Sequence, residues 1–207
     1  MWLQVFNANP YGTNCWLLSA EGSDDAVVVD PGFEPEAVHA MLRAVGKTPV
    51  AIVATHAHVD HAAAAGDFAG ELPVFVHDAD AVAFTDEIAW NAGFDNPLTP
   101  VKDLRTIADG DVLRFAGCSL EVMHTPGHTP GHCSFRVDGD VVVFAGDLVF
   151  AGSIGRSDLP NSDPIAMQAS LRRFLTLPDA LPVMPGHGPD TTVGRERASN
   201  PFLRELA

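Results

Sequence analysis

Short apolar runs separated by polar turn residues open the chain. The first three runs are Leu3–Phe6, Cys15–Leu18 and Ala26–Val29, and between them lie Asn-Pro-Tyr-Gly and Glu-Gly-Ser-Asp-Asp. Gly, Pro, Asn, Asp and Ser favour turns because they supply or tolerate the backbone angles that a turn requires. The pattern therefore predicts three successive antiparallel strands.

A helix and a strand then lead into a group of polar residues. One face of a 3.6-residue period is apolar over Ala37, Val38, Met41, Leu42 and Val45. Pro35 near the start and Gly46 at the end mark the limits of this predicted helix. Val50–Ala54 has the composition of a buried strand, and Ala62–Phe68 is typical of a helix. The histidine-rich residues between them are therefore predicted to form a strand-to-helix loop.

The following residues predict further strands and one more helix. Pro73–Val76 is a predicted strand, Ala79–Ala92 a predicted helix, and Asn96–Pro100 an irregular stretch. Later strands are predicted at Val112–Phe115, Leu120–Met123, Cys133–Val137 and Val141–Phe144. Glycines and prolines between these runs favour turns, so they predict a second group of antiparallel strands.

The last part of the chain predicts a helix and a strand. Asp163 can cap a helix that begins at Pro164, and Leu181–Met184 is a predicted strand. The order of strands, helix, strands, helix thus occurs twice, without a repeat or a linker. Two sheets packed face to face with helices outside would satisfy this order, so we predict an α/β fold with one domain over residues 1–207.

The balance of charge restricts the class of partner. Lys and Arg number 12 against 27 Asp and Glu, a formal charge of −15. Such a surface repels nucleic-acid phosphates and anionic lipids, so we expect neither a nucleic-acid nor a membrane partner. A small-molecule substrate is the remaining expectation, and two divalent metal ions in one pocket would attract an anionic one. The residue types leave the oligomeric state open.

The cysteines and the first residues bear on the cellular compartment. Cys15, Cys118 and Cys133 contain no C-x-x-C spacing and are odd in number, which favours buried reduced thiols over a disulfide framework. Residues 1–11 lack a signal-peptide pattern, and no apolar run reaches membrane-spanning length. We expect a cytoplasmic protein.

The strongest chemical motif lies directly after the buried strand at Val50–Ala54. Thr55-His56-Ala57-His58-Val59-Asp60-His61 places three imidazoles and a carboxylate within one loop. Side chains at i and i+2 of an extended segment point the same way, so His56 and His58 can bind one ion. As the chain turns into the helix, Asp60 and His61 are directed toward a second ion. Imidazole and carboxylate are ligands that zinc and similar metals favour.

Three further candidate ligands follow other predicted strands. His128 lies in a Gly- and Pro-rich turn, Asp147 follows Val141–Ala145 through Gly146, and His187 lies in a Pro-Gly-His-Gly loop. Each alone could be a structural residue. Together, at strand ends, they can complete two coordination shells.

The ordered set of seven residues resembles the metallo-β-lactamase superfamily over essentially the whole chain. The resemblance implies an αββα sandwich of two mixed, mainly antiparallel sheets with helices on the outer faces. It also implies a first metal on His56, His58 and His128, a second on Asp60, His61 and His187, and Asp147 as the bridge.

Several segments also resemble glyoxalase II and its short, single-domain relatives. They are Thr125–His132, Gly155–Pro160 and Thr191–Phe202. This resemblance implies hydrolysis of a thioester of glutathione or another low-molecular-weight thiol, such as S-D-lactoylglutathione. Full-length glyoxalase II binds glutathione through an additional C-terminal helical domain, for which too few residues follow His187. Arg156 is a candidate contact for an anionic substrate, although fixing its loop is the favoured role.

The expected cofactors are two divalent metal ions, with zinc as the default and iron or manganese as alternatives. A water shared by two cations is acidified toward neutral pH, so a metal-bound hydroxide can attack the thioester carbonyl. Asp60 would bind metal and orient that hydroxide. The remaining histidines match no ligand position. His124 and His132 are candidates either for orienting the ligands or for a hydrogen-bonded structural role.

Three alternatives remain open. A persulfide dioxygenase resembles glyoxalase II but uses one iron, held by two histidines and an aspartate. The lactonases of the superfamily place a tyrosine beside the metals, whereas the only tyrosine here is Tyr11 in an early loop. A metal-binding regulatory protein without turnover is a third reading, and the intact ligand set argues against it.

Overall fold

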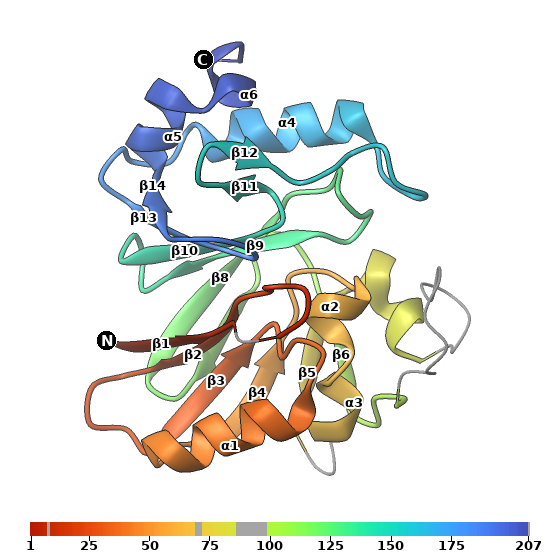
Figure 1. Cartoon of the computed structure of the whole chain (residues 1–207), viewed down its shortest axis with the longest axis vertical. Coiled ribbons are helices and arrows are strands. Elements are labelled where there is room, and N and C mark those ends of the chain that lie inside the picture. Colours follow the sequence, from red (N-terminus) through yellow and green to blue (C-terminus); the bar gives the residue numbers. More distant parts are fainter. Residues whose placement is uncertain (8, 69–71, 86–98, 207) are drawn as a thin grey trace.

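Two six-stranded sheets stacked face to face form the centre of the molecule (Figure 1). The computed structural model describes residues 1–7, 9–68, 72–85 and 99–206. The first sheet has the order β1 (Trp2–Phe6), β2 (Cys15–Ser19), β3 (Asp25–Val29), β4 (Thr48–Val53), β5 (Val74–His77), β6 (Leu104–Ile107). The second has the order β14 (Thr191–Thr192), β13 (Pro182–Pro185), β10 (Val142–Gly146), β9 (Cys133–Val137), β8 (Cys118–His124), β7 (Val112–Phe115).

Both sheets are mixed. The first three strands pair antiparallel, as predicted, whereas β3 to β6 pair parallel. The second sheet is antiparallel except for the parallel pair of β10 and β13. A separate ribbon joins β11 (Val149–Phe150) to β12 (Ser153–Ile154). The predicted α/β sandwich with helices on its outer faces is confirmed.

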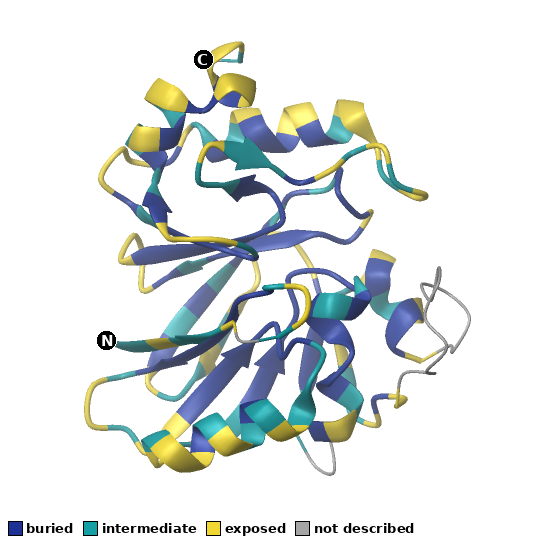
Figure 2. Ribbon diagram, in the orientation of Figure 1, coloured by how far each residue is buried: buried dark blue, intermediate teal, exposed yellow. Residues whose placement is uncertain are grey.

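Helices cover the outer face of each sheet (Figure 1). On the first sheet lie α1 (Pro35–Val45), α2 (Val59–Ala62) and α3 (Ala65–Phe68), and the second sheet carries α4 (Pro164–Phe174), α5 (Val193–Ser199) and α6 (Pro201–Arg204). Burial follows these layers (Figure 2). Separate apolar clusters lie under α1 and α3, between the two sheets, and under α4 to α6. No helix of the described residues is long and apolar enough to cross a bilayer.

Two predicted elements differ in the structure, and one strand of the first sheet was not predicted. The predicted helix Ala62–Phe68 is two short helices, and the first begins earlier, at Val59, inside the histidine motif. The predicted helix Ala79–Ala92 is a 3₁₀-helix, η1, over Asp78–Phe84; residues 86–92 lie outside the described part of the chain, as do residues 96–98 of the irregular stretch. The strand Leu104–Ile107 was missed because its two central residues are exposed and polar.

The helix α4 begins at the cap that the sequence predicts. The side chain of Asp163 accepts hydrogen bonds from the backbone amides of Ile165 and Ala166, 2.8 and 3.1 Å away. Pro164 occupies the first turn, where its missing amide hydrogen costs nothing. The buried face of the helix includes Leu171 and Phe174, so the cap anchors the apolar layer on the second sheet.

We expect Asp163→Ala to lower the free energy of unfolding by about 1 kcal/mol, because two amides of the first turn lose their acceptor. Asp163→Asn is the matched control, since its amide oxygen can still accept both hydrogen bonds. Urea denaturation of the two variants measures the difference. Equal stability of both variants with the wild type would contradict the role of the cap.

Candidate metal centre

The histidine motif leaves the central strand of the first sheet at its carboxyl end. β4 lies between β3 and β5 and pairs parallel with both, so its end is fixed from two sides. His56 follows in an extended segment, and His58 keeps an extended backbone as the residue that precedes α2. Asp60 and His61 belong to α2 itself. The backbone changes from extended to helical inside the motif. His56 and His58 therefore belong to one group of converging side chains, and Asp60 and His61 to another.

The three remaining candidate ligands come from the second sheet. His128 lies in the turn between β8 and β9, Asp147 follows β10, and His187 follows β13. β8 and β10 both run antiparallel to β9, and β13 runs parallel to β10, so all three ends lie at one edge of the sheet. The backbone amide of Cys133 donates to the carbonyl of Thr55, 2.8 Å away, and joins this edge to the motif of the first sheet.

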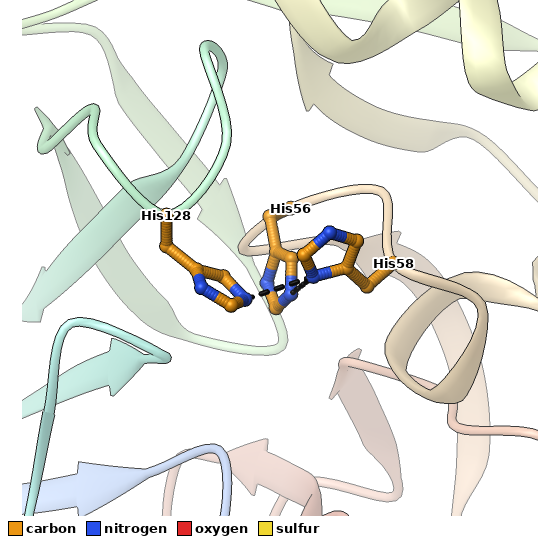
Figure 3. Close-up of side chains that lie close together, drawn as sticks. All are labelled: His56, His58 and His128. Carbon is orange, nitrogen blue, oxygen red and sulfur yellow. Dashed lines mark hydrogen bonds between the residues drawn. The ribbon is translucent and has the colours of Figure 1, made fainter. Parts of the chain in front are cut away.

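A first group consists of three histidines whose ring nitrogens converge (Figure 3). Nε2 of His56 lies 3.1 Å from Nδ1 of His58. The same nitrogen of His58 lies 2.8 Å from Nε2 of His128. One nitrogen from each ring therefore faces a common point.

A second group lies beside the first and consists of Asp60, His61 and His187. Nε2 of His187 is 3.2 Å from Oδ2 of Asp60 and 3.2 Å from Nε2 of His61. Nε2 of His61 is 3.5 Å from Oδ2 of Asp60. This group combines a carboxylate with two imidazoles.

Asp147 lies between the two groups. Its Oδ2 is 3.4 Å from Nε2 of His128 and 3.6 Å from Nε2 of His187. Its Oδ1 is buried and makes no hydrogen bond, although Nε2 of His61 lies 3.2 Å away. A buried carboxylate oxygen without a hydrogen bond is costly unless a cation compensates it. All seven residues that the sequence singled out as ligands are thus brought together.

Glycine at position 186 leaves the room that this arrangement needs. A Cβ atom at Gly186 would lie 2.2 Å from Oδ1 of Asp147 and 2.6 Å from Cε1 of His61. The side chain of any other residue would clash with Asp147 and His61. The Pro-Gly-His-Gly sequence is therefore explained by close packing as well as by its turn.

Hydrogen bonds on the far side of three rings fix which nitrogen carries a proton. Nδ1 of His128 lies 2.7 Å from the backbone carbonyl of Arg156, and a carbonyl can only accept. Nδ1 of His61 lies 2.9 Å from the carboxylate of Asp30. Each Nδ1 therefore donates, and each Nε2 faces the centre with a lone pair when the ring is neutral.

The third ring, His56, is fixed through Thr55. The hydroxyl of Thr55 donates to Oδ2 of Asp30, 2.7 Å away, so its oxygen is left to accept from Nδ1 of His56 at 3.0 Å. Nε2 of His56 therefore also presents a lone pair to the centre. Anchoring of this kind is what metal-binding histidines need, because it holds the ring orientation and the tautomer.

Two histidines of the first group, His56 and His58, are held in their neutral form. Burial, with neighbouring histidines adding to it, holds the pKa of His56 well below its usual range. Burial and the neighbouring His128 lower the pKa of His58 to about 4. Both rings are therefore neutral at physiological pH. Nε2 of His56 and Nε2 of His128 both face Nδ1 of His58, so a cation among these three nitrogens can be bound by all of them. This donor set fits a divalent metal ion of the zinc type.

The carboxylates of the second group are ionised. Burial raises the pKa of Asp147, but His61 outweighs it and the pKa falls to about 2. Burial likewise raises the pKa of Asp60, and contacts with His61, His187 and Thr13 bring it below the usual range. In the absence of an ion, burial lowers the pKa of His61 and the surrounding carboxylates outweigh it, so that ring attracts a proton. A cation could take the place of that proton.

Two residues that contact the candidate ligands, Asp30 and Thr13, were not predicted from the sequence. Asp30 is buried and accepts from the amide and hydroxyl of Thr55 as well as facing His61. Its φ of 52° is a left-handed conformation that aspartate tolerates. Thr13 donates its hydroxyl to Oδ2 of Asp60 at 2.8 Å. An aspartate directly after a buried strand was the available signal for the first; nothing in the local sequence marked the second.

Arg156 and His132 lie near the centre in different ways. The side chain of Arg156 is exposed and forms an ion pair with Asp158, while its backbone carbonyl orients His128. That geometry favours the loop-fixing role. His132 is wholly buried, and its Nε2 accepts from the backbone amide of Asp147 at 3.0 Å. It therefore fixes the turn that presents the carboxylate of Asp147.

The fold and this ligand set together define a metallohydrolase centre. A model of the metallo-β-lactamase superfamily matches residues 8–187, and the chain belongs to that superfamily. Hydroxyacylglutathione hydrolase GloC of Haemophilus influenzae is 32% identical, with 97% of each chain covered.

Two solved structures extend the comparison. The B3 metallo-β-lactamase BLEG-1 superposes with a TM-score of 0.90 at 34% identity, covering 98% of this chain and 99% of its own. A di-iron-bound form of the protein TTHA1623 superposes with a TM-score of 0.85 at 40% identity, covering 97% of this chain and 100% of its own. The superfamily resemblance of the sequence is confirmed.

The buried His132 predicts a loss of stability in acid. Burial, followed by the neighbouring His128, lowers its pKa to about 3, against about 6.5 in an unfolded chain. As the pH falls below about 6.5, the unfolded state takes up the proton before the folded state does, so the free energy of unfolding decreases. In the metal-free protein, His132→Gln should make this decrease shallower.

Urea denaturation of the metal-free wild type and of His132→Gln, between about pH 7.5 and about pH 5.5, measures the two slopes. The other histidines are common to both proteins, so the difference between the slopes reports His132 alone. Parallel curves would show that His132 is not held neutral in the folded state.

Proposed function

We propose that the seven converging side chains hold two divalent metal ions. His56, His58 and His128 bind the first ion, Asp60, His61 and His187 bind the second, and Asp147 bridges them. The unpaired buried oxygen of Asp147 and the three facing imidazole nitrogens support this. Zinc is the default metal for these ligands, with iron or manganese as alternatives. The likeness to a protein with a di-iron-bound form supports iron as the first alternative.

We propose further that the protein is a hydrolase of thioesters of a low-molecular-weight thiol, such as S-D-lactoylglutathione. The observation that carries this is the paired site itself, in which neutral imidazoles and ionised carboxylates face one another at the edge of both sheets. The similarity to hydroxyacylglutathione hydrolase GloC supports the thioester as substrate.

In this proposed reaction, Asp60 orients the water that attacks the substrate carbonyl. Metal ions held by these residues would supply a water of lowered pKa and polarise the substrate carbonyl. Asp60 stays an acceptor because its pKa lies below the usual range, and the hydroxyl of Thr13 holds its Oδ2 in place. It can therefore orient the attacking water. The departing thiolate has a pKa of about 8.5, so a dedicated acid is not required.

Charge supports an anionic substrate at this centre in spite of the acidic chain. The formal charge is −15, and the nearby Arg156 is paired with Asp158. Two divalent ions would therefore be the main local positive charge, and a substrate carboxylate would be drawn to them. Arg156 can add a contact only where its guanidinium leaves Asp158.

β-Lactam hydrolysis is a second candidate, favoured by the structural likeness to BLEG-1. It uses the same attack on a carbonyl, but its leaving group is an amide nitrogen, which departs less readily than a thiolate. A persulfide dioxygenase, with a single iron, is the third. Oxygen uptake with a glutathione persulfide separates it from both hydrolases.

The test is elemental analysis of the purified protein, followed on the same sample by hydrolysis of S-D-lactoylglutathione and of a β-lactam, and by persulfide-dependent oxygen uptake. We expect two ions per chain and thioester hydrolysis. One iron with oxygen uptake, or β-lactam hydrolysis without thioester hydrolysis, would replace the proposal by the corresponding alternative.

Two substitutions test the ligands directly. His58→Ala and Asp147→Ala should lower kcat/KM by more than about 100-fold and lower the metal content with it, because each removes a direct ligand, whereas loss of an outer-shell partner already costs about 10- to 100-fold. Cys118→Ala is the control, since that buried thiol lies in the core between the sheets. Unchanged turnover in the first two variants would contradict the ligand set.

A further inference from the structure

Asp80 is a buried carboxylate that belongs to neither group of candidate ligands. It lies on η1, between β5 and β6 in the sequence, and its exposed fraction is 0%. Buried aspartates are rare unless they are paired or fully hydrogen-bonded. The buried carboxylate of Asp80 therefore requires hydrogen-bond donors or a positive charge nearby.

Three hydrogen bonds connect Asp80 to the two loops that carry the first group of histidines. Its Oδ2 accepts from the backbone amide of Ala57 at 3.1 Å and from the hydroxyl of Thr129 at 2.7 Å. Its Oδ1 accepts from the backbone amide of Gly131 at 2.7 Å. One carboxylate thus ties a loop of the first sheet to a loop of the second.

The points of attachment lie next to the ligands. Ala57 separates His56 from His58, and Thr129 directly follows His128. Gly131 permits the close approach, because a Cβ atom there would lie 2.6 Å from Cγ of Asp80. A shift of Asp80 would therefore change the distance between the three imidazoles.

We propose that Asp80 is a positioning residue for the first metal ion: it holds the loops of His56, His58 and His128 at the separation that one ion requires. The inference rests on the proposed binuclear centre. It concerns only the first ion, because no hydrogen bond of Asp80 in the described part of the chain reaches Asp60, His61 or His187.

The negative charge of Asp80 also favours a cation bound by the first group of histidines. The three groups that donate to Asp80 are two amides and a hydroxyl, all neutral, so they leave its negative charge uncompensated. A divalent ion on the three imidazoles of the adjoining loops would supply the missing positive charge. The carboxylate and the first ion therefore stabilise each other.

Asp30 provides the contrast. The carboxylate of Asp30 contacts His61 directly, and it is linked to His56 through the hydroxyl of Thr55. It is therefore connected to one ligand of each group. Loss of Asp30 is expected to weaken both ions. Loss of Asp80 is expected to weaken only one.

The experiment measures Zn²⁺ affinity by competition with a chromophoric chelator in two backgrounds. His187→Ala removes a ligand of the second ion and leaves the first group intact, whereas His58→Ala does the reverse. Adding Asp80→Asn should weaken Zn²⁺ binding about 10- to 100-fold in the His187→Ala background. It should change binding by less than about 3-fold in the His58→Ala background, which is below the effect expected for an outer-shell partner.

The control is Asp138→Asn. Asp138 also accepts a backbone amide and a hydroxyl, both from Ser119, but it is exposed and lies in the turn after β9. It should change Zn²⁺ affinity in neither background. Thr129→Val is the second variant, which removes one hydrogen bond to Asp80 with little change of shape and should weaken the first ion alone. It decides the question if Asp80→Asn does not fold.

Equal weakening in both backgrounds, or none in the His187→Ala background, would overturn the inference and leave the binuclear centre standing. A wild-type protein that binds fewer than two Zn²⁺ ions would overturn the binuclear proposal and the inference with it. Selective weakening of the first ion by either variant supports the inference.

Discussion

The ring nitrogens of several buried imidazoles converge with two carboxylates on one small region, and the rest of the centre depends on this convergence. Nδ1 of His128 and of His61 is held by an acceptor on the outside, so each ring turns Nε2 inward. Protonation of His56 and His58 is opposed by burial. Bound cations would be held by these nitrogens and by the ionised carboxylates beside them, so metal binding is expected to stabilise the fold.

The sandwich makes this arrangement possible because it brings the ends of unconnected strands to one edge. The motif after β4 belongs to the first sheet, whereas the ligands after β8, β10 and β13 belong to the second. The hydrogen bond between Cys133 and Thr55 joins the two sheets at that edge, and Asn14 fixes the loop of His187 by donating to the carbonyls of Pro185 and Gly188. Backbone and amide contacts thus set the distances before any ion binds.

Much of this could be predicted from the sequence, and the reasons are local. The strands were recognisable because their apolar runs are bounded by turn residues, and the seven ligand candidates because His and Asp are crowded after buried strands. The boundary at Val59 was missed, since a helix of four residues leaves almost no periodic pattern. Asp80 could not be found, because its role lies in contacts with residues 23 and 51 positions away along the chain.

Anomalous X-ray diffraction from crystals of the metal-loaded protein tests the central claim most directly. The account predicts two peaks in each chain, one within about 2 Å of the nitrogens of His56, His58 and His128, the other beside Asp60, His61 and His187. The carboxylate of Asp147 should contact both. A single peak, or ions bound away from these side chains, would contradict it.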